Sequence, residues 1–211
     1  IEVQVLGDES GNVGHLWDRD CSLQRRRQKL VELAPAPHLS EETRGDMISA
    51  ALTMARAAGL RGLATIEFLL DGETGDFVFM EANPRLQVEH TVTEAISGLD
   101  LVEIQFALAS GRSLEQLGLA DQPFTPADRR AVQLRINLET LGADGQATPA
   151  SGTLSVYEPP GGPGIRVDGA GYAGYTNTAG FDSLLAKLVV SGQGSLKELM
   201  RKAYRALCEF R

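Results

Sequence analysis

Apolar and polar residues alternate along several short stretches of the chain, which is typical of β-strands with one buried face. Residues 1–8 and 11–20 are two such stretches around a polar turn, and they predict an antiparallel hairpin. A second hairpin is predicted for 64–71 and 76–83, where aromatic and β-branched residues flank the turn sequence GETG. Further strands are predicted at 131–137, 165–167 and 182–190.

Helical spacing of apolar residues predicts four helices between these strands. Ser40 is a good N-cap for a helix over 41–58, which Gly59 ends. The other predicted helices cover 90–96, 101–109 and the segment from about Ser195 to the C-terminus. The fold class is therefore α+β. We expect a first unit at 1–110, a polar, Pro-containing linker at 111–130 and a second unit at 131–211.

The register of the second hairpin decides which side chains meet. If Asp71 pairs with Phe77, Leu69 opposes Phe79 and Glu67 opposes Glu81, because opposed residues point to the same face. One face is then wholly apolar and should be buried; its members are Ile66, Phe68, Leu70, Val78, Met80 and Ala82. The other face carries Glu67, Glu81 and Asn83 beside an apolar patch.

Two carboxylates that face each other repel unless a positive charge lies between them. Oxygen ligands of this kind suit Mg²⁺, which usually takes one or two carboxylates together with waters and substrate phosphates. The pair Glu67 and Glu81, with Asn83, therefore indicates a metal–nucleotide site. The alternative is an ordinary solvated sheet face.

Two cationic segments flank this hairpin. In 84–90 the residues Arg85, Gln87 and Glu89 alternate, so an extended chain would project all three to one side as a seat for a small anion. Upstream, 24–29 holds several cations in close succession, which suits phosphate or carbonate oxygens. A surface turn with an ion pair and a solvated basic loop are the respective alternatives.

Composition narrows the functional classes. A net charge of −8 argues against a nucleic-acid surface, and no apolar run approaches the ~20 residues of a membrane helix. Two cysteines among 211 residues and no visible signal peptide fit the cytoplasm. Because the chain starts without Met inside a strand and stops within a helical pattern, we expect a piece of a longer protein.

Two long signatures, DRDCSLQRRRQKLVELAPAP at 18–37 and MEANPRLQVEHTVTE at 80–94, resemble biotin carboxylase, the ATP-grasp component of biotin-dependent carboxylases. The similarity runs from Ile1 to the C-terminus. It implies that 1–110 is the C-terminal part of an ATP-grasp domain and 131–211 a truncated biotin carboxylase C-terminal domain. It also implies a ligase that uses ATP and bicarbonate to carboxylate biotin, through carboxyphosphate, on a biotin carboxyl carrier protein that works with a carboxyltransferase.

The resemblance assigns roles to individual residues. Glu67, Glu81 and Asn83 would hold Mg²⁺ or Mn²⁺, Glu89 would be the general base and Arg85 would stabilise the enolate-like charge on biotin. The residues implied to contact ATP are Gln24, Arg27, Glu67, Leu69 and Glu81. Those implied to contact bicarbonate are Lys29, Arg85 and the backbone of Val88. Arg135 and Asp182 are implied to contact biotin.

The sequence departs from the family at some positions. Arg27 replaces a usual His, and Pro163 replaces an aromatic residue of the subunit interface, whereas the interface arginine is matched by Arg166 and implies a homodimer. The family's glycine-rich lid and nucleotide-binding lysines have no counterpart here, so we expect little ATP turnover from this chain alone. The alternatives are a non-catalytic dimerisation or scaffold module and another ATP-grasp ligase such as carbamoyl-phosphate synthase.

Overall fold

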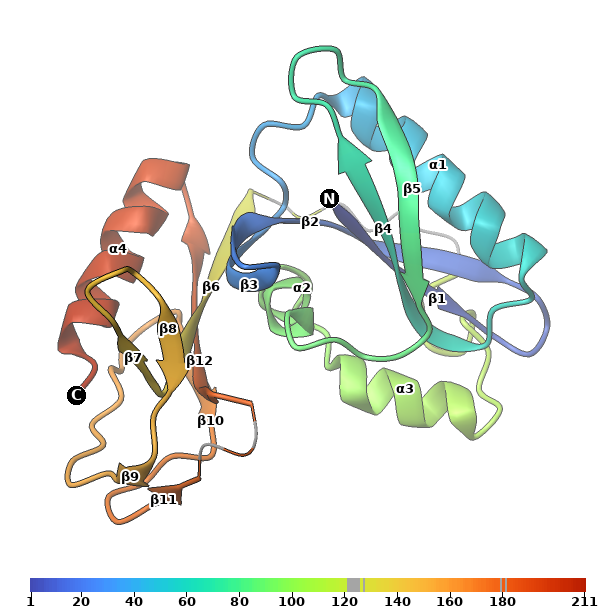
Figure 1. Cartoon of the computed structure of the whole chain (residues 1–211). Coiled ribbons are helices and arrows are strands. Elements are labelled where there is room, and N and C mark those ends of the chain that lie inside the picture. The colour runs from blue at the N-terminus through green and yellow to red at the C-terminus, as the bar shows by residue number, and fades with distance from the viewer. Residues whose placement is uncertain (121–125, 127, 179, 181) are drawn as a thin grey trace.

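The computed structural model describes residues 1–211 except 121–125, 127, 179 and 181, and part of the predicted linker 111–130 lies outside the described residues. Its main feature is one antiparallel sheet of eight strands that runs through the whole molecule in the order β10-β12-β6-β3-β2-β1-β4-β5 (Figure 1). The strands of this sheet are β1 (Glu2–Gly7), β2 (Val13–Arg25), β3 (Gln28–Ala34), β4 (Gly62–Leu70), β5 (Phe77–Asn83), β6 (Arg129–Asn137), β10 (Ile165–Gly169) and β12 (Leu184–Gln193).

Two small two-stranded sheets and four helices complete the α+β fold, as predicted. The small sheets pair β7 (Glu139–Leu141) with β8 (Ala147–Pro149) and β9 (Gly152–Thr153) with β11 (Thr176–Asn177). The helices are α1 (Glu41–Ala57), α2 (His90–Ser97), α3 (Leu101–Ala109) and α4 (Leu196–Glu209). Among the described residues, no helix is long and apolar enough to cross a membrane.

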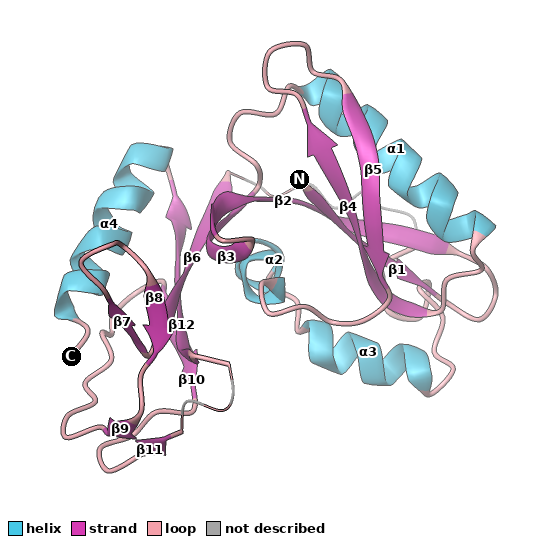
Figure 2. Ribbon diagram, in the orientation of Figure 1, coloured by secondary structure: helices cyan, strands magenta, loops and turns pink. Residues whose placement is uncertain are grey.

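The helices lie along different parts of the sheet (Figure 2), and the buried side chains form separate clusters. α1 packs on β1 and β2, α3 on β4, and α4 on β12 and β6. α2 lies where the strands of the two predicted units meet, and its Val92 and Ile96 bury against Ala34, Ala131 and Val189. The sheet therefore passes without a break from β3 to β6, with α2 packed over the junction.

The predicted N-cap Ser40 is confirmed, whereas the C-cap of α1 is Ala58, one residue before the predicted Gly59. Ser40 accepts a hydrogen bond from Thr43 N at 3.1 Å, and Ser195 forms a reciprocal capping box with Glu198. Gly98 follows α2 with φ +74°, a left-handed conformation that glycine adopts without steric cost.

The first predicted hairpin is confirmed, since Gly7 of β1 pairs with Val13 of β2. The basic segment that follows is itself a turn between strands: β2 and β3 pair, and Arg26 and Arg27 sit at its tip with φ of 53° and 67°. The sequence had suggested only a loop there.

The register predicted for the second hairpin is wrong at the turn and right at the acidic pair. Phe77 pairs with Leu70 rather than Asp71, while Glu67 does pair with Glu81. A β-bulge at Met80, between the pairs Phe68–Phe79 and Glu67–Glu81, absorbs the extra residue.

The bulge also corrects the predicted faces of β5. Val78 now opposes Leu69 on the face of Glu67, and Phe79 opposes Phe68. Ile66 and Phe68 are buried as predicted, but Val78 and Met80 are 59% and 56% exposed. The reason is position, because β5 is the edge strand of the sheet and is covered on neither face over most of its length.

Candidate functional site

A cleft of about 270 Å³ lies where the turn of β2 and β3, the 84–90 segment and the strands β6 and β12 approach one another. It gathers every residue proposed from the sequence except Gln24 and Leu69. The residues that line it are Arg27, Gln28, Lys29, Glu67, Glu81, Asn83, Arg85, Gln87, Val88, Glu89, Arg135, Asn137, Asp182, Ser183 and Leu184.

At one end of the cleft, oxygen donors converge from the β4–β5 hairpin. The amide nitrogen of Asn83 donates to Glu67 Oε1 at 2.9 Å and to Glu81 Oε1 at 3.0 Å, so it joins the two opposed carboxylates. Two carboxylates and an amide fit a hard divalent cation by donor type. Coordination by Asn83 would require its Oδ1 to face the carboxylates, a half-turn of the amide group.

Glu67 is held by a buried network behind it. Gln87 Nε2 donates to Glu67 Oε1 at 2.8 Å, and Gln87 Oε1 accepts from Arg19 Nη2 at 3.1 Å. Because a guanidinium can only donate, Arg19 fixes which end of the Gln87 amide faces Glu67. Arg19 is fully buried.

Glu89 stands in the middle of the cleft between two cations. Lys29 Nζ lies 2.7 Å from Glu89 Oε1, and Arg135 Nη2 lies 3.2 Å from Glu89 Oε2. The side chain of Glu89 is 3% exposed. The carboxylate therefore faces the cleft with both oxygens in contact with positive charge.

Lys29 is shared among three carboxylates, since it also contacts Glu2 and lies 3.3 Å from Glu67 Oε1. Burial alone would lower the pKa of Lys29, but the charges of Glu2 and Glu89 outweigh it and raise that pKa. Lys29 is thus a permanent cation at neutral pH.

Arg135 reaches the cleft from β6. Its Nε donates to Glu32 Oε1 at 2.7 Å, and burial raises the pKa of Glu32 although Arg135 opposes that effect. Arg85, by contrast, is exposed and has only long contacts of 3.4 Å, with Leu86 O and Asn83 Oδ1. Its guanidinium remains available to a ligand.

The other proposed residues lie at the margin. Asp182 lines the cleft and accepts from the backbone N of Leu184 at 3.1 Å. Gln24 is exposed and donates to Cys21 O of its own strand at 2.9 Å. Leu69 is 60% exposed on the hairpin, and Arg27 is exposed at the β2–β3 turn.

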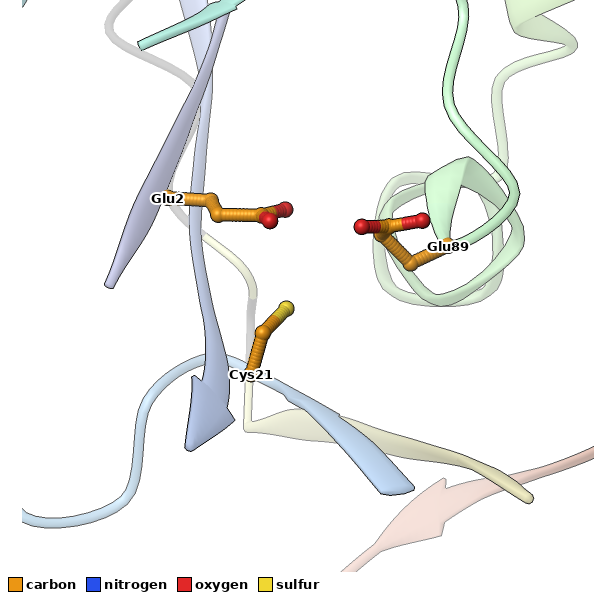
Figure 3. A group of neighbouring side chains, drawn as sticks. All are labelled: Glu2, Cys21 and Glu89. Atoms are coloured by element: carbon orange, nitrogen blue, oxygen red, sulfur yellow. The ribbon is translucent and has the colours of Figure 1, made fainter. Parts of the chain in front are cut away.

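A second buried cluster lies beside the cleft, where Glu2 of β1, Cys21 of β2 and Glu89 point toward one another (Figure 3). Their ligand atoms lie within 4.8 Å of one another. Lys29 already contacts both carboxylates, and burial together with Glu2 raises the pKa of the Cys21 thiol well above its usual range. A protonated thiol beside an ion-paired lysine is a poor metal site.

Sequence reasoning missed Glu2 and Arg19, which form the support of the cleft. Arg19 Nε donates to Glu2 Oε2 at 3.0 Å, and the two residues are opposed in β1 and β2. The available signal was a charged residue in each strand of a predicted hairpin, at positions that pair. It could have predicted an ion pair but not its burial.

Comparison with known proteins gives two family matches that together span most of the chain. Residues 1–117 match the model described as carbamoyl-phosphate synthase L chain, ATP binding domain. Residues 133–211 match the biotin carboxylase C-terminal domain.

Similar proteins cover the whole chain. Pyruvate carboxylase of Pichia angusta is 45% identical over 212 residues, which are 100% of this chain and 18% of that protein. A solved biotin carboxylase domain of a single-chain bacterial carboxylase is 48% identical with a TM-score of 0.91, over 100% of this chain and 47% of that one. The biotin carboxylase domain dimer of Hydrogenobacter thermophilus 2-oxoglutarate carboxylase, in complex with magnesium ADP and bicarbonate, is 42% identical with a TM-score of 0.89 and is covered to 45%. The chain thus spans less than half of each protein it matches here.

Proposed function

This chain belongs to the biotin carboxylase family and corresponds to the C-terminal part of the biotin carboxylase domain, and from that premise we propose that the protein carrying it is an ATP-dependent ligase that carboxylates biotin with bicarbonate. The observation that supports this most directly is a single cleft in which paired carboxylates meet a cation-flanked glutamate. The alternative, another ATP-grasp ligase such as carbamoyl-phosphate synthase, is supported by the description of the family model that matches residues 1–117. The C-terminal domain match favours biotin carboxylation instead.

In this proposal Glu67, Glu81 and Asn83 hold Mg²⁺ or Mn²⁺ that accompanies ATP. The carboxylate oxygens of Glu67 and Glu81 lie within hydrogen-bond reach of the Asn83 amide nitrogen, and all three residues belong to the β4–β5 hairpin. The metal would neutralise phosphate charge. Leu69, Gln24 and Arg27 would contact the nucleotide from the exposed side, with Arg27 near its phosphates.

Bicarbonate would bind beside Glu89, between Lys29, Arg85 and the backbone N–H of Val88. Val88 lines the cleft, and its N–H makes no hydrogen bond within the part of the chain that the structure describes. Glu89 would remove the bicarbonate proton so that the oxygen can attack the terminal phosphorus of ATP, with ADP as the leaving group, and form carboxyphosphate. Fixed cations around it would stabilise the negative charge that develops.

Carboxyphosphate would then break down into CO₂ and phosphate at the other side of the same cleft. The ureido nitrogen of biotin would lose its proton and bond to the CO₂. Arg135 and Asp182 would hold biotin, and Arg85 would stabilise its enolate-like charge.

We infer a biotin carboxyl carrier protein or domain and a carboxyltransferase as partners, since the matched pyruvate carboxylase is far longer than this chain. A homodimer and a cytoplasmic location complete the proposal. The dimer is supported by the dimeric form of a similar domain, and the location by two free cysteines, Cys21 and Cys208.

The test is bicarbonate-dependent ATP hydrolysis with free biotin, measured on the complete protein that carries this chain. Arg85→Ala should lower kcat/KM by about 10²- to 10³-fold, the usual cost of one oxyanion donor. Arg201→Ala is the matched control, because Arg201 is exposed on α4 and lines no part of the cleft. Parental activity in Arg85→Ala would refute the assignment. Because the matched domains are more than twice as long as this chain, we expect the chain by itself to turn over little ATP.

A further inference from the structure

Two side chains outside the cleft hold the backbone of residues 87–89 from behind. His90 Nδ1 lies 2.7 Å from Gln87 O, and Lys187 Nζ donates to Val88 O at 3.1 Å. A carbonyl oxygen only accepts, so Nδ1 of His90 must carry the hydrogen. His90 is the first residue of α2 and Lys187 belongs to β12, so the anchors come from different units of the fold.

Neither anchor takes part in lining the cleft, and both are largely buried. Their side chains are each 13% exposed. A charge cluster surrounds them: Glu94 Oε1 lies 3.7 Å from His90 Nε2, and Asp168 Oδ2 lies 3.8 Å from Lys187 Nζ. Arg166 joins the two acids, at 2.7 Å from Glu94 and 2.6 Å from Asp168.

The anchor on Gln87 O determines where the Val88 N–H points. The two groups belong to one trans peptide, in which C=O and N–H point in opposite directions. With the carbonyl held by His90, the N–H is directed away from the His90 ring, and Val88 is among the residues that line the cleft. A hydrogen bond to the carbonyl also polarises the peptide and strengthens its N–H as a donor.

The anchor on Val88 O acts on the next peptide, from which the side chain of Glu89 departs. Lys187 pairs with Arg135 across β12 and β6, and Arg135 contacts Glu89 Oε2 at 3.2 Å. One pair of opposed residues therefore holds both the backbone before Glu89 and its carboxylate.

We propose that His90 and Lys187 are positioning residues for bicarbonate, which set the Val88 N–H and the Glu89 carboxylate in the orientation that the anion requires. This inference rests on the proposed function. It adds two residues that touch neither nucleotide nor metal, and it predicts an effect confined to one substrate.

Steady-state kinetics on the complete protein test the idea with matched pairs of variants. His90→Gln moves the N–H donor to about the place of Nε2 and leaves none at the place of Nδ1, and Lys187→Met removes the ammonium donor. His90→Asn keeps an N–H near the place of Nδ1, and Lys187→Arg keeps a cation. The first pair should raise the KM for bicarbonate on the order of 10-fold, since small misplacement near a reacting group is costly, and leave the KM for ATP within about twofold. The second pair should stay near the parent.

Equal rises in both KM values, or no rise for bicarbonate, would overturn the inference. If Arg85→Ala lacks activity while His90→Gln and Lys187→Met behave like the parent, the proposed function stands and only the positioning role fails. Parental activity in Arg85→Ala would instead remove the proposed function itself.

A binding measurement tests the same role without turnover. In the complete protein, labelled with ¹⁵N at valine, titration with bicarbonate should shift the Val88 amide proton in a saturable way, and His90→Asn should preserve that shift. No saturable shift in the parent protein would contradict the proposed role of the Val88 N–H.

Discussion

Replacing Arg19 by methionine is the sharpest test of how the cleft is supported. The guanidinium is fully buried and donates hydrogen bonds from all three of its nitrogens. The acceptors and distances are Glu2 Oε2 at 3.0 Å, Gln4 Oε1 at 2.8 Å, Thr93 Oγ1 at 2.9 Å, Thr65 Oγ1 at 3.0 Å and Gln87 Oε1 at 3.1 Å. They come from β1, β4, α2 and the segment before α2.

Arg19→Met keeps the aliphatic part of the side chain and removes every one of these donors. Glu2 then retains only Lys29 as a cationic partner, and a buried carboxylate that loses its guanidinium typically destabilises a fold by about 3–5 kcal/mol. Since whole domains are stable by about 5–15 kcal/mol, the variant should be folded but marginal.

Urea unfolding followed by circular dichroism measures this loss. Arg205→Met is the control, because Arg205 forms only an exposed i,i+4 pair with Glu209 at 3.5 Å and should cost about 0.3–0.5 kcal/mol. A loss in Arg19→Met no larger than in Arg205→Met would refute the view that this network stabilises the sheet beneath the cleft.

Three further predictions concern packing, pH and the metal. A Cβ on Gly7 would lie 2.2 Å from Leu60 O, so Gly7→Ala should cost about 1–3 kcal/mol in urea unfolding, whereas Gly45→Ala in open space on α1 should gain about 0.5–1 kcal/mol. Burial would raise the pKa of Asp168, but Arg166 lowers it below 3.8, so its stabilising contribution is present above that pH and lost below it. Thermal unfolding of Asp168→Asn should therefore change less than the parent on acidification below pH 3.8; an equal change would contradict the pairing. Glu67→Gln should weaken magnesium-dependent nucleotide binding at least about 10-fold by calorimetry, and unchanged binding would exclude Glu67 as a ligand.

Local signals were enough to predict the helices and the two hairpins, but not β3 or the short strands β7, β8, β9 and β11. The N-caps Ser40 and Ser195 and the left-handed Gly98 depend on contacts within a few residues of the chain, so a short stretch of sequence is enough to predict them. The pairing of Glu67 with Glu81 was predicted for a similar reason, because two strands joined by a short turn have few registers available.

The exposure of β5 could not be predicted in the same way. Alternation of apolar and polar residues indicates that one face of a strand can be buried. Whether another element covers that face depends on the order of the strands in the sheet. Val78 and Met80 lie on the edge strand, and the bulge shifts their pairing by one residue. The turn decides this shift: Asp71 N donates to Asp76 O at 2.8 Å, and Asp71 Oδ1 accepts from Glu73 N at 2.8 Å, so Asp71 belongs to the loop rather than to the strand.

The cleft depends on contacts that no stretch of sequence contains. Glu89 meets Lys29 and Arg135, which are 60 and 46 positions away, because β3 pairs with β6 and brings the strands that carry the two cations together. Arg135 in turn pairs with Lys187 of β12. Arg135 contacts the Glu89 carboxylate and Lys187 holds the backbone before Glu89, so the pairing of β6 with β12 positions both cations. If that pairing organises the site, a shift of β12 against β6 should disturb Glu89 more than Glu67, whose partners Asn83 and Gln87 belong to β5 and to the segment before α2. The anion half and the metal half of the cleft are then separable, and damage to the β6–β12 pair should appear in the use of bicarbonate before it appears in the binding of nucleotide.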